Sequence, residues 1–261
     1  MKSFVCALLL GFTMWAFAGE MPNAAIEVVA PNGKAAPAVT EESTALEVLS
    51  ACRAMLPVRP IELTGALILR SRKGIVTSEY DYRLVMRRGD DISLLTVKLM
   101  PRGETNEIAA VTLSRRQGQK TVIRLSRPGA PEAEVVDSLL SRVQGTDVTW
   151  LDLSFDFLWW RNASYEADRE GESVHGQKCR VILVRPDVEI KGLSAVRLWV
   201  DRKTGCLMQA EQIGEDGRPI RRLWGTRVKR MDGKWMVSVL EVETLGARHR
   251  TKITVDRLHE L

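Results

Sequence analysis

Residues 198–222 read LWVDRKTGCLMQAEQIGEDGRPIRR, and two polar, glycine-bearing breaks divide this stretch into short runs of alternating character. The breaks are DRKTG (201–205) and GEDGRP (214–219). Side chains of a strand point alternately to its two faces, and Asp-Gly supplies the backbone angles of tight hairpin turns. The stretch therefore predicts antiparallel strands joined by two hairpins.

The same alternation recurs on both sides of this stretch. Upstream it fills residues 61–126, as in SEYDYRLVMRR (78–88), and downstream it resumes near residue 164 and continues to residue 258. An open antiparallel sheet with this many strands tends to curl or close on itself. The predicted fold class is mainly β with helical inserts (α+β): a strongly curved antiparallel sheet, or half-open β-barrel, of about eleven strands.

Two segments interrupt the strand pattern and are predicted to be helical inserts that cover the concave side of the sheet. In residues 40–56 apolar side chains recur at helical spacing, and Thr40 can cap the first turn. The second insert spans about 131–160. Within it, residues 131–144 predict a short helix, and the aromatic run TDVTWLDLSFDFLWW (146–160) follows.

The N-terminal residues have the pattern of an export signal. Residues 1–18, MKSFVCALLLGFTMWAFA, contain a basic start, an apolar run and a small-x-small end. They predict a secretory signal peptide cleaved after Ala18, and the alternative is an N-terminal membrane anchor, for which the run is short. Residues 19–39, rich in Ala and Pro, predict a flexible leader, and residues 40–261 predict a single domain. The expected location is the periplasm.

The charge pattern argues against a nucleic-acid partner. The chain has 38 Lys and Arg against 33 Asp and Glu, a net charge of +5, which loss of the signal would lower by one. A mild excess interspersed with acidic residues suits anionic lipid or simple solubility better than nucleic acid. A basic group on one predicted hairpin is either a rim for phosphate headgroups or an acidic partner, or a charged sheet edge: Arg221, Arg222, Arg227, Lys229 and Arg230.

Three cysteines remain after the predicted cleavage: Cys52, Cys179 and Cys206. Cysteines of an exported protein tend to pair, and Cys179 and Cys206 lie in neighbouring parts of the predicted sheet. We therefore expect a Cys179–Cys206 disulfide, and the alternative is three buried thiols.

No residue pattern points to catalysis or to a metal. His175, His249 and His259 stand alone, without the spacing of metal ligands. Asp152 and Asp156 lie four residues apart, but no His, Ser or Lys partner is near them in the sequence, so solvated or capping roles are expected. The sequence predicts a protein that is not an enzyme and has no metal and no cofactor.

Three segments of the second half resemble the outer-membrane lipoprotein-sorting protein family, the periplasmic carriers of the LolA/LolB-like fold. They are GTDVTWLDL (145–153), LWVDRKTGCLMQAEQIGEDGRPIRRL (198–223) and DGKW (232–235) followed by VLEVET. The match covers residues 145–256 by motif and residues 40–126 by architecture. Cys206 departs from the family pattern, which usually has an aliphatic residue there.

The resemblance implies a half-open β-barrel with a helical lid and an apolar interior that holds acyl chains or a lipidated partner. The expected lid is the aromatic run, whose residues could equally fill the core: Trp150, Leu151, Leu153, Phe155, Phe157, Leu158, Trp159 and Trp160. A stripe on one sheet face would line the interior: Leu67, Leu69, Tyr80, Tyr82, Leu84, Met86, Leu95, Val97 and Leu99.

The function expected from the sequence is a periplasmic carrier or chaperone, in outer-membrane lipoprotein sorting, that binds acyl chains of lipoproteins or lipids. Its partners would be a lipidated protein or lipid acyl chains, with a membrane-associated donor or acceptor, and the carrier itself would be a monomer. The alternative is a non-catalytic structural or interaction module of the cell envelope whose β-barrel core is filled.

Overall fold

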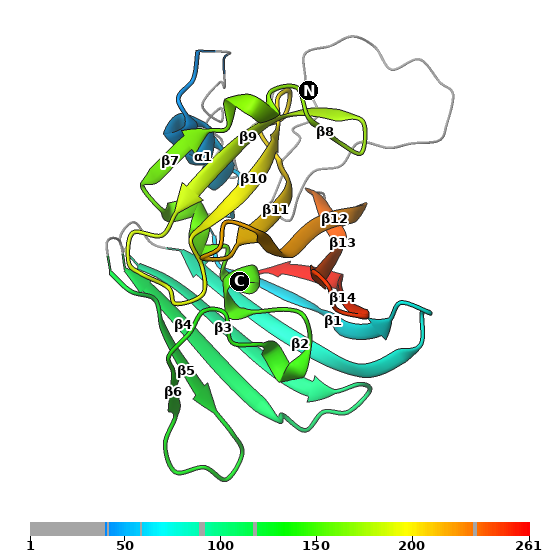
Figure 1. Cartoon of the computed structure of the whole chain (residues 1–261). Helices are drawn as coiled ribbons and strands as arrows, with labels where there is room; N and C mark the ends of the chain where they lie inside the picture. Colours follow the sequence, from blue (N-terminus) through cyan, green and yellow to red (C-terminus); the bar gives the residue numbers. More distant parts are fainter. Residues whose placement is uncertain (1–39, 41, 58, 89–91, 117–118, 232–233) are drawn as a thin grey trace.

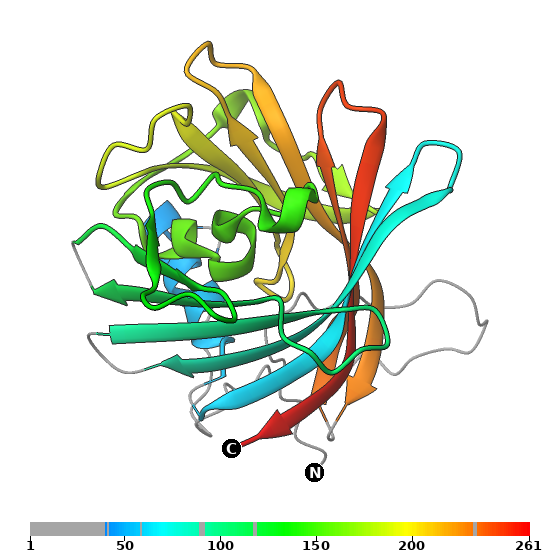
Figure 2. The same ribbon diagram turned by 90° about the horizontal axis from the view of Figure 1, so that it is seen from below.

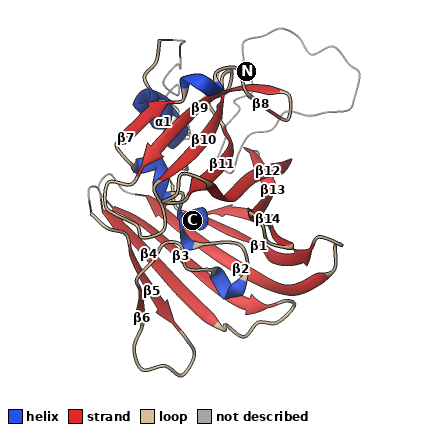
Figure 3. Cartoon of the chain, viewed as in Figure 1, coloured by secondary structure: helices blue, strands red, loops and turns tan. Residues whose placement is uncertain are grey.

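The computed structural model describes residues 40, 42–57, 59–88, 92–116, 119–231 and 234–261, and strands make up most of them (Figures 1 and 3). The predicted signal peptide and leader lie outside the described residues, as does the predicted Asp-Gly turn at 232–233. The mainly β fold class is confirmed. In chain order the elements are α1 (Ala45–Ala54), β1 (Ile61–Ser71), β2 (Val76–Arg88), β3 (Ile92–Pro101), β4 (Ala109–Arg116), β5 (Val122–Ser126), β6 (Glu134–Val136), η1 (Val143–Gly145), α2 (Trp150–Ser154), η2 (Asp156–Trp159), β7 (Asn162–Tyr165), η3 (Ala167–Arg169), β8 (Ser173–Val174), β9 (Gln177–Arg185), β10 (Ala195–Asp201), β11 (Leu207–Ile213), β12 (Pro219–Met231), β13 (Lys234–Thr244) and β14 (His249–Glu260).

The strands form one antiparallel sheet of fourteen strands in the order β6-β5-β4-β3-β2-β1-β14-β13-β12-β11-β10-β9-β7, with β8 paired to β9. Strands joined by a hairpin pair with each other, as the turn sequences predict. The first and last strands, β1 and β14, also pair, in the middle of the sheet. The sheet therefore consists of two meanders, a first one from β1 to β6 and a second one from β7 to β14, which are joined along β1 and β14 (Figure 1).

The free edges of this sheet are the short strands β6 and β7. We call the gap between these edges the seam; the chain that connects them, residues 137–161, contains η1, α2 and η2. The sheet bends into an open curve with the helical segments between its two halves (Figure 2). The sequence pattern predicts about eleven strands in a meander that helices interrupt once. The structure has more, because β6 and β8 are strands of three and two residues with little alternation to reveal them.

Helix α1 begins later than predicted. Thr44, not Thr40, is the capping residue: its hydroxyl accepts from the Glu47 backbone N–H at 3.3 Å, and the Glu47 carboxylate accepts from the Thr44 N–H at 2.6 Å. This reciprocal capping box satisfies two amide groups that a helix start leaves open. No helix in the described part of the chain combines the length and apolar character needed to cross a bilayer.

The predicted helix over residues 131–144 is absent, which corrects the sequence analysis. Residues 134–136 instead form β6, in which Val136 pairs with Ile123 of β5. Two consecutive β-branched valines favour the pleated conformation over a helix. The helical part of the insert is confined to η1, α2 and η2, and Phe155 separates α2 from η2 with a left-handed backbone (φ 50°).

The predicted sheet stripe shares one face of β1, β2 and β3. Register pairs such as Leu67 with Tyr80 and Leu84 with Val97 place these side chains opposite each other. All of the stripe except Leu69 belongs to the buried core or packs against it. Leu69 is half-buried and lies near the end of β1, beyond the core. The same core contains the buried face of α1 and most of the aromatic run.

The predicted Cys179–Cys206 disulfide is not formed, and all three described cysteines are buried thiols. Cys179 pairs in register with Asp201 of β10, and the Asp201 N–H donates to the carbonyl of Cys206 on the other side. Strand β10 therefore lies between the two cysteines. Two strand spacings amount to roughly 9–10 Å, which exceeds the span of a disulfide.

Candidate functional site

A cleft of about 350 Å³ lies at the seam. Its walls come from the turn between β4 and β5, the chain after β6, η2, and the loop between β9 and β10. We call it the seam cleft; its lining residues are Arg115, Arg116, Gln119, Lys120, Thr121, Asp137, Ser138, Leu139, Asp156, Trp159, Trp160, Asp187, Val188, Glu189, Ile190 and Lys191.

A buried ion pair and an indole ring form the inner wall of the seam cleft. The Arg115 guanidinium lies 3.4 Å from the Asp156 carboxylate and stacks over the Trp159 ring at 4.1 Å. The Thr121 hydroxyl donates to Asp156 at 3.0 Å. Burial lowers the pKa of Arg115 and raises the pKa of Asp156, and each charge partly offsets this effect on the other. The side chains of the pair are only 13% and 9% exposed, so burial opposes the charge on each.

A smaller, mainly apolar hollow of about 40 Å³ lies behind this wall. We call it the inner chamber. It shares Arg115, Thr121, Asp156 and Trp159 with the seam cleft, so these side chains border both spaces. Its other lining residues include two members of the predicted stripe and the end of the α1 segment: Leu56, Met86, Leu94, Leu95, Leu113 and Ser154. Displacing the Trp159 ring would join the two spaces.

The predicted lid residues lie together in the structure, and all but one are buried in the core. Phe157 packs edge-on against Phe155, with ring centroids 5.8 Å apart, and against Trp160 at 6.5 Å. Trp159 is the exception, because it is only partly buried and faces both hollows. In this state the aromatic run is part of the packed core.

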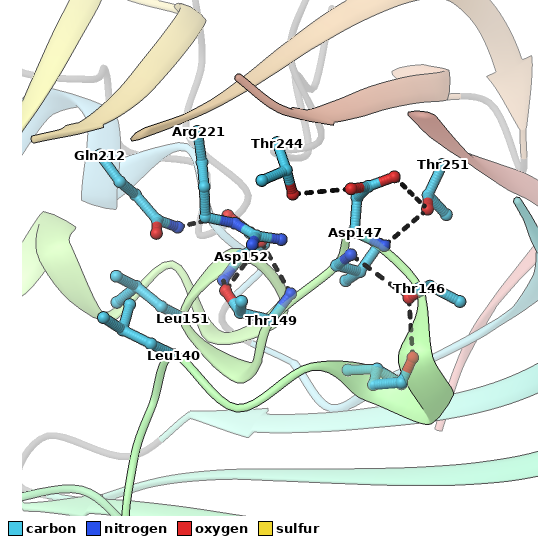
Figure 4. Close-up of polar contacts among 12 residues, drawn as sticks. Leu140, Thr146, Asp147, Thr149, Leu151, Asp152, Gln212, Arg221, Thr244 and Thr251 are labelled. Atoms are coloured by element: carbon cyan, nitrogen blue, oxygen red, sulfur yellow. Dashed lines mark hydrogen bonds and ion pairs between the residues drawn. The ribbon is translucent and has the colours of Figure 1, made fainter. Parts of the chain in front are cut away.

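A buried polar network, which we call the polar clamp, fixes the N-terminal end of the aromatic run to the second meander (Figure 4). The Asp147 carboxylate accepts from the hydroxyls of Thr244 at 2.6 Å and Thr251 at 3.2 Å, and lies 2.8 Å from His249 Nδ1. The Asp147 N–H donates to Thr251 Oγ1 at 2.8 Å. Both threonine hydroxyls point at this carboxylate rather than at the imidazole, so the group is a structural anchor.

The second half of the polar clamp is built around Asp152. Its Oδ2 accepts from the N–H and hydroxyl of Thr149, both at 2.8 Å, in a capping box that starts α2. Its Oδ1 accepts from Gln212 Nε2 at 2.8 Å, and Arg221 Nε lies 3.9 Å from Oδ2. Burial raises the pKa of Asp152 and lowers that of Arg221. Asp152 is therefore a capping residue, as predicted, but a buried one (Figure 4).

This network explains two sequence features. The GTDVTWLDL motif places Asp147 and Asp152 five residues apart so that each reaches the second meander at a different point. The predicted basic group is divided by the sheet: Arg221 faces the interior and Asp152, while Arg222 pairs with Glu211 on the opposite face at 2.7 Å. Arg227, Lys229 and Arg230 remain exposed.

The sequence pattern identified Trp159 and Trp160 but not the other side chains that form the walls of the seam cleft. Arg115, Thr121 and the loop at 187–191 come from separate elements, and nothing in the linear sequence connects them. One signal existed in Asp156, an acidic residue inside an apolar run. Such a residue is commonly buried with a charged partner, here Arg115.

Arg53 of α1 holds the C-terminal end of the aromatic run. Arg53 Nη1 donates to the Leu158 carbonyl at 2.7 Å, and Arg88 Nη1 donates to the Arg53 carbonyl at 2.7 Å. The polar clamp thus anchors the start of the run, and Arg53 anchors η2. Phe155, with its left-handed backbone, lies between the two anchors.

Replacing Arg53 with methionine is expected to loosen η2 while the sheet stays intact. A hydrogen bond from a charged donor contributes about 1.5–3 kcal/mol, so the amides of Leu158 and Trp160 should exchange hydrogen roughly tenfold faster or more. Hydrogen exchange with peptide-level mass spectrometry measures this. Arg59→Met, at an exposed arginine, is the control, and equal exchange in the two variants would contradict the anchoring role.

The fold is shared with solved structures of bacterial proteins. A DUF1329 family protein from Desulfovibrio piger has a TM-score of 0.70 and 15% identity, over 83% of this chain and 91% of that one. A domain named for outer membrane lipoprotein sorting, from Vibrio parahaemolyticus, has a TM-score of 0.71 and 17% identity, over 83% and 92%. A LolA superfamily protein from Nitrosomonas europaea has a TM-score of 0.62 and 15% identity, over 84% and 94%.

Sequence comparisons add less than these structures. A family model described as "Uncharacterized protein" matches residues 135–259, and a search of curated proteins found no match. At the identities above, the structural likeness is one of fold. At that level the predicted resemblance to outer-membrane lipoprotein-sorting proteins is confirmed.

Proposed function

We propose that this protein is a non-catalytic carrier in the periplasm that binds acyl chains of a lipid or a lipidated protein. The observation that carries the proposal is the inner chamber, an apolar space separated from the seam cleft by a few side chains. The fold supports it, because one structure that shares it is named for lipoprotein sorting. The predicted signal peptide and the absence of a nucleic-acid signature agree with this location.

In this proposal the acyl chain enters through the seam cleft and displaces η2. Trp159 would swing first, and the acyl chain would then extend along the stripe from Met86 toward Leu84 and Tyr82, which the core fills in this state. These three side chains follow one another on the same face of β2, opposite Leu95, Val97 and Leu99 of β3. Phe157 and Leu158 of η2 would exchange their core contacts for contacts with the acyl chain, and α2 would stay fixed by the polar clamp.

The energies involved permit such an exchange. Each buried methylene contributes about 0.8 kcal/mol, so a long acyl chain offers on the order of 10 kcal/mol. Removing a buried aromatic ring from a core costs about 3–5 kcal/mol. Segment η2 carries two rings, Phe157 and the partly buried Trp159, so displacing both costs about 6–10 kcal/mol. One long acyl chain can offset this cost, whereas a short chain would not. Transfer to a membrane-associated acceptor would let η2 return.

The test is lipid binding by the purified full chain. Native mass spectrometry of protein from the bacterial periplasm should show bound lipid, and a fluorescent long-chain fatty acid should bind. Met86→Trp places a larger ring in the inner chamber and should weaken binding about tenfold or more. Leu46→Trp, on the exposed side of α1, should bind normally. No bound lipid together with no probe binding by the wild-type chain would exclude the carrier function.

A second candidate is a non-catalytic envelope module that contacts a partner protein and keeps its core filled. The nearly complete burial of the aromatic run favours it. Trp159→Ala separates the two candidates, because Trp159 is the partly exposed member of the run. A carrier should change its affinity for the fatty-acid probe with little change in melting temperature. A filled module should show no probe binding in either form.

A further inference from the structure

We propose that Cys52 and Cys206 form a disulfide bond in the exported protein and thereby fasten α1 to the turn before β11. The inference rests on the periplasmic location in the proposed function, since thiols are kept reduced in the cytosol. It concerns a pair that the linear sequence does not suggest, because the two residues belong to an N-terminal helix and a distant hairpin.

The two thiols lie at the same point of contact between α1 and the β10–β11 turn. Cys52 Sγ donates to the carbonyl oxygen of Gly205 at 3.1 Å, and Cys206 is the next residue. One peptide unit separates that oxygen from the Cα of Cys206, about 3 Å. The Cys52 sulfur is therefore within roughly 6 Å of the Cys206 Cα, so rotation of the two side chains can bring the sulfurs to bonding distance.

Contacts of Met55 confirm that the Cys206 side chain faces this side of α1. Cys206 Sγ lies 3.8 Å from Met55 Sδ. Met55 follows Cys52 by three residues, so both project from one side of the helix. A methyl group added at Gly205 would lie 3.1 Å from Met55 Cε, which shows how closely the turn approaches the helix. Cys52 and Cys206 are both almost completely buried.

The third thiol is outside this contact. Cys179 belongs to β9, and β10 lies between it and Cys206. Its Sγ donates to the Gln177 carbonyl at 3.3 Å. Oxidation of the protein should therefore join Cys52 to Cys206 and leave Cys179 as a thiol.

The chemistry is thiol–disulfide exchange with a disulfide-bearing oxidoreductase, or with oxidised glutathione in vitro. One cysteine thiolate attacks the oxidant's disulfide, forms a mixed disulfide and releases one oxidant thiol. The second cysteine then attacks the mixed disulfide, closes Cys52–Cys206 and releases the other oxidant thiol. Burial raises the pKa of Cys52 to about 12, so the thiolate is scarce once the chain is folded. The bond should form during folding, before α1 is packed.

The Cys52–Cys206 disulfide would determine which segment of the interior moves when an acyl chain enters. It would fix α1 to the second meander, and Arg53 on α1 contacts η2 from this fixed position. The moving segment would then be η2, between Phe155 and the start of β7, and its movement would break the hydrogen bond from Arg53 to the Leu158 carbonyl. Lipid entry and disulfide formation are thus compatible in one molecule.

The experiment is peptide mapping of the full chain exported to the bacterial periplasm, denatured in a thiol-alkylating reagent without reductant. We expect a peptide pair joined at Cys52 and Cys206, two hydrogens lighter than the reduced pair, and an alkylated Cys179. Cys179→Ser should keep the bond, and Cys52→Ser or Cys206→Ser should abolish it. Alkylation of all three cysteines, or a bond that includes Cys179, overturns the proposal.

Thermal unfolding provides a second measurement. Reductant should lower the midpoint of the exported wild-type chain by about 10 °C, and should leave that of Cys52→Ser unchanged. An equal response of both chains overturns the proposal. The peptide mapping does not depend on lipid binding. A protein with bound lipid and three alkylated cysteines would contradict only the disulfide proposal. A protein with the mapped disulfide and no bound lipid would contradict only the carrier proposal.

Discussion

Replacing Gly65 with alanine is expected to abolish most of the folded protein. A Cβ at this position would lie 1.8 Å from the carbonyl oxygen of Thr254 and 2.9 Å from the Tyr82 hydroxyl oxygen. Gly65 sits at a register shift between β1 and β14. These two strands join the meanders, so neither backbone can move away without breaking the ladder that holds the two halves together.

The cost should exceed the usual penalty for overpacking, about 1–3 kcal/mol, because the obstacle is backbone and not a flexible side chain. Urea unfolding of the wild-type and variant chains measures it. Gly129→Ala is the control: Gly129 has a left-handed backbone (φ 80°) with nothing within 4 Å of an added Cβ, so strain alone should cost about 1–2 kcal/mol. A Gly65→Ala chain as stable as Gly129→Ala would disprove the close approach of β1 and β14.

Replacing Asp152 with alanine is expected to cost about 3–5 kcal/mol, because buried donors without an acceptor cost about 1–3 kcal/mol each. The Thr149 N–H, the Thr149 hydroxyl and Gln212 Nε2 would all lose their acceptor. Asp152→Asn should be much milder. Its amide oxygen can still accept from Thr149, and its amide nitrogen can donate to Gln212 Oε1, which has no partner now. Urea unfolding at neutral pH compares the two variants.

The contribution of Asp152 to the free energy of unfolding depends on pH, and the direction of its pKa shift fixes the sign of that dependence. Burial raises the folded-state pKa of Asp152 above its unfolded value, so the charged form is disfavoured in the fold. The stabilising contribution of this group is fully present below the unfolded pKa of about 4 and is lost as pH rises through the folded value. The Asn variant should therefore be most favourable relative to wild type at neutral pH. A stability difference that stays constant from pH 7 to pH 4 would contradict this.

Local pattern predicted the parts of the fold that depend on neighbours in the chain. Strands β1–β5 and β9–β14 lie where alternation and turn residues place them, since a strand's period and a hairpin's backbone angles are local properties. The register of the stripe followed from the same period. The prediction of a helix was wrong at residues 134–136, because two valines in a polar stretch give too weak a strand pattern to outweigh the surrounding helix formers.

The candidate site was predicted only in part. The aromatic run was recognised as the segment that meets the stripe, because its apolar area exceeds what one helix face needs. The wall between the seam cleft and the inner chamber was not, because Arg115 and Asp156 are far apart along the chain and meet only after the sheet bends. Asp147 and Asp152 were visible as a motif, yet their partners Thr244, Thr251 and Gln212 were not.

The amino-acid order alone predicted an export signal, which stays a prediction, and it predicted the series of hairpins, the curved sheet and one unusually aromatic insert. Long-range packing decided that β1 meets β14, that the free edges are β6 and β7, and that Cys206 lies beside Cys52 with β10 between it and Cys179. The physical reason is the range of the forces. Backbone angles and side-chain period act over a few residues, whereas pairing between distant strands depends on which apolar faces and which close backbone approaches, such as that at Gly65, fit together in three dimensions.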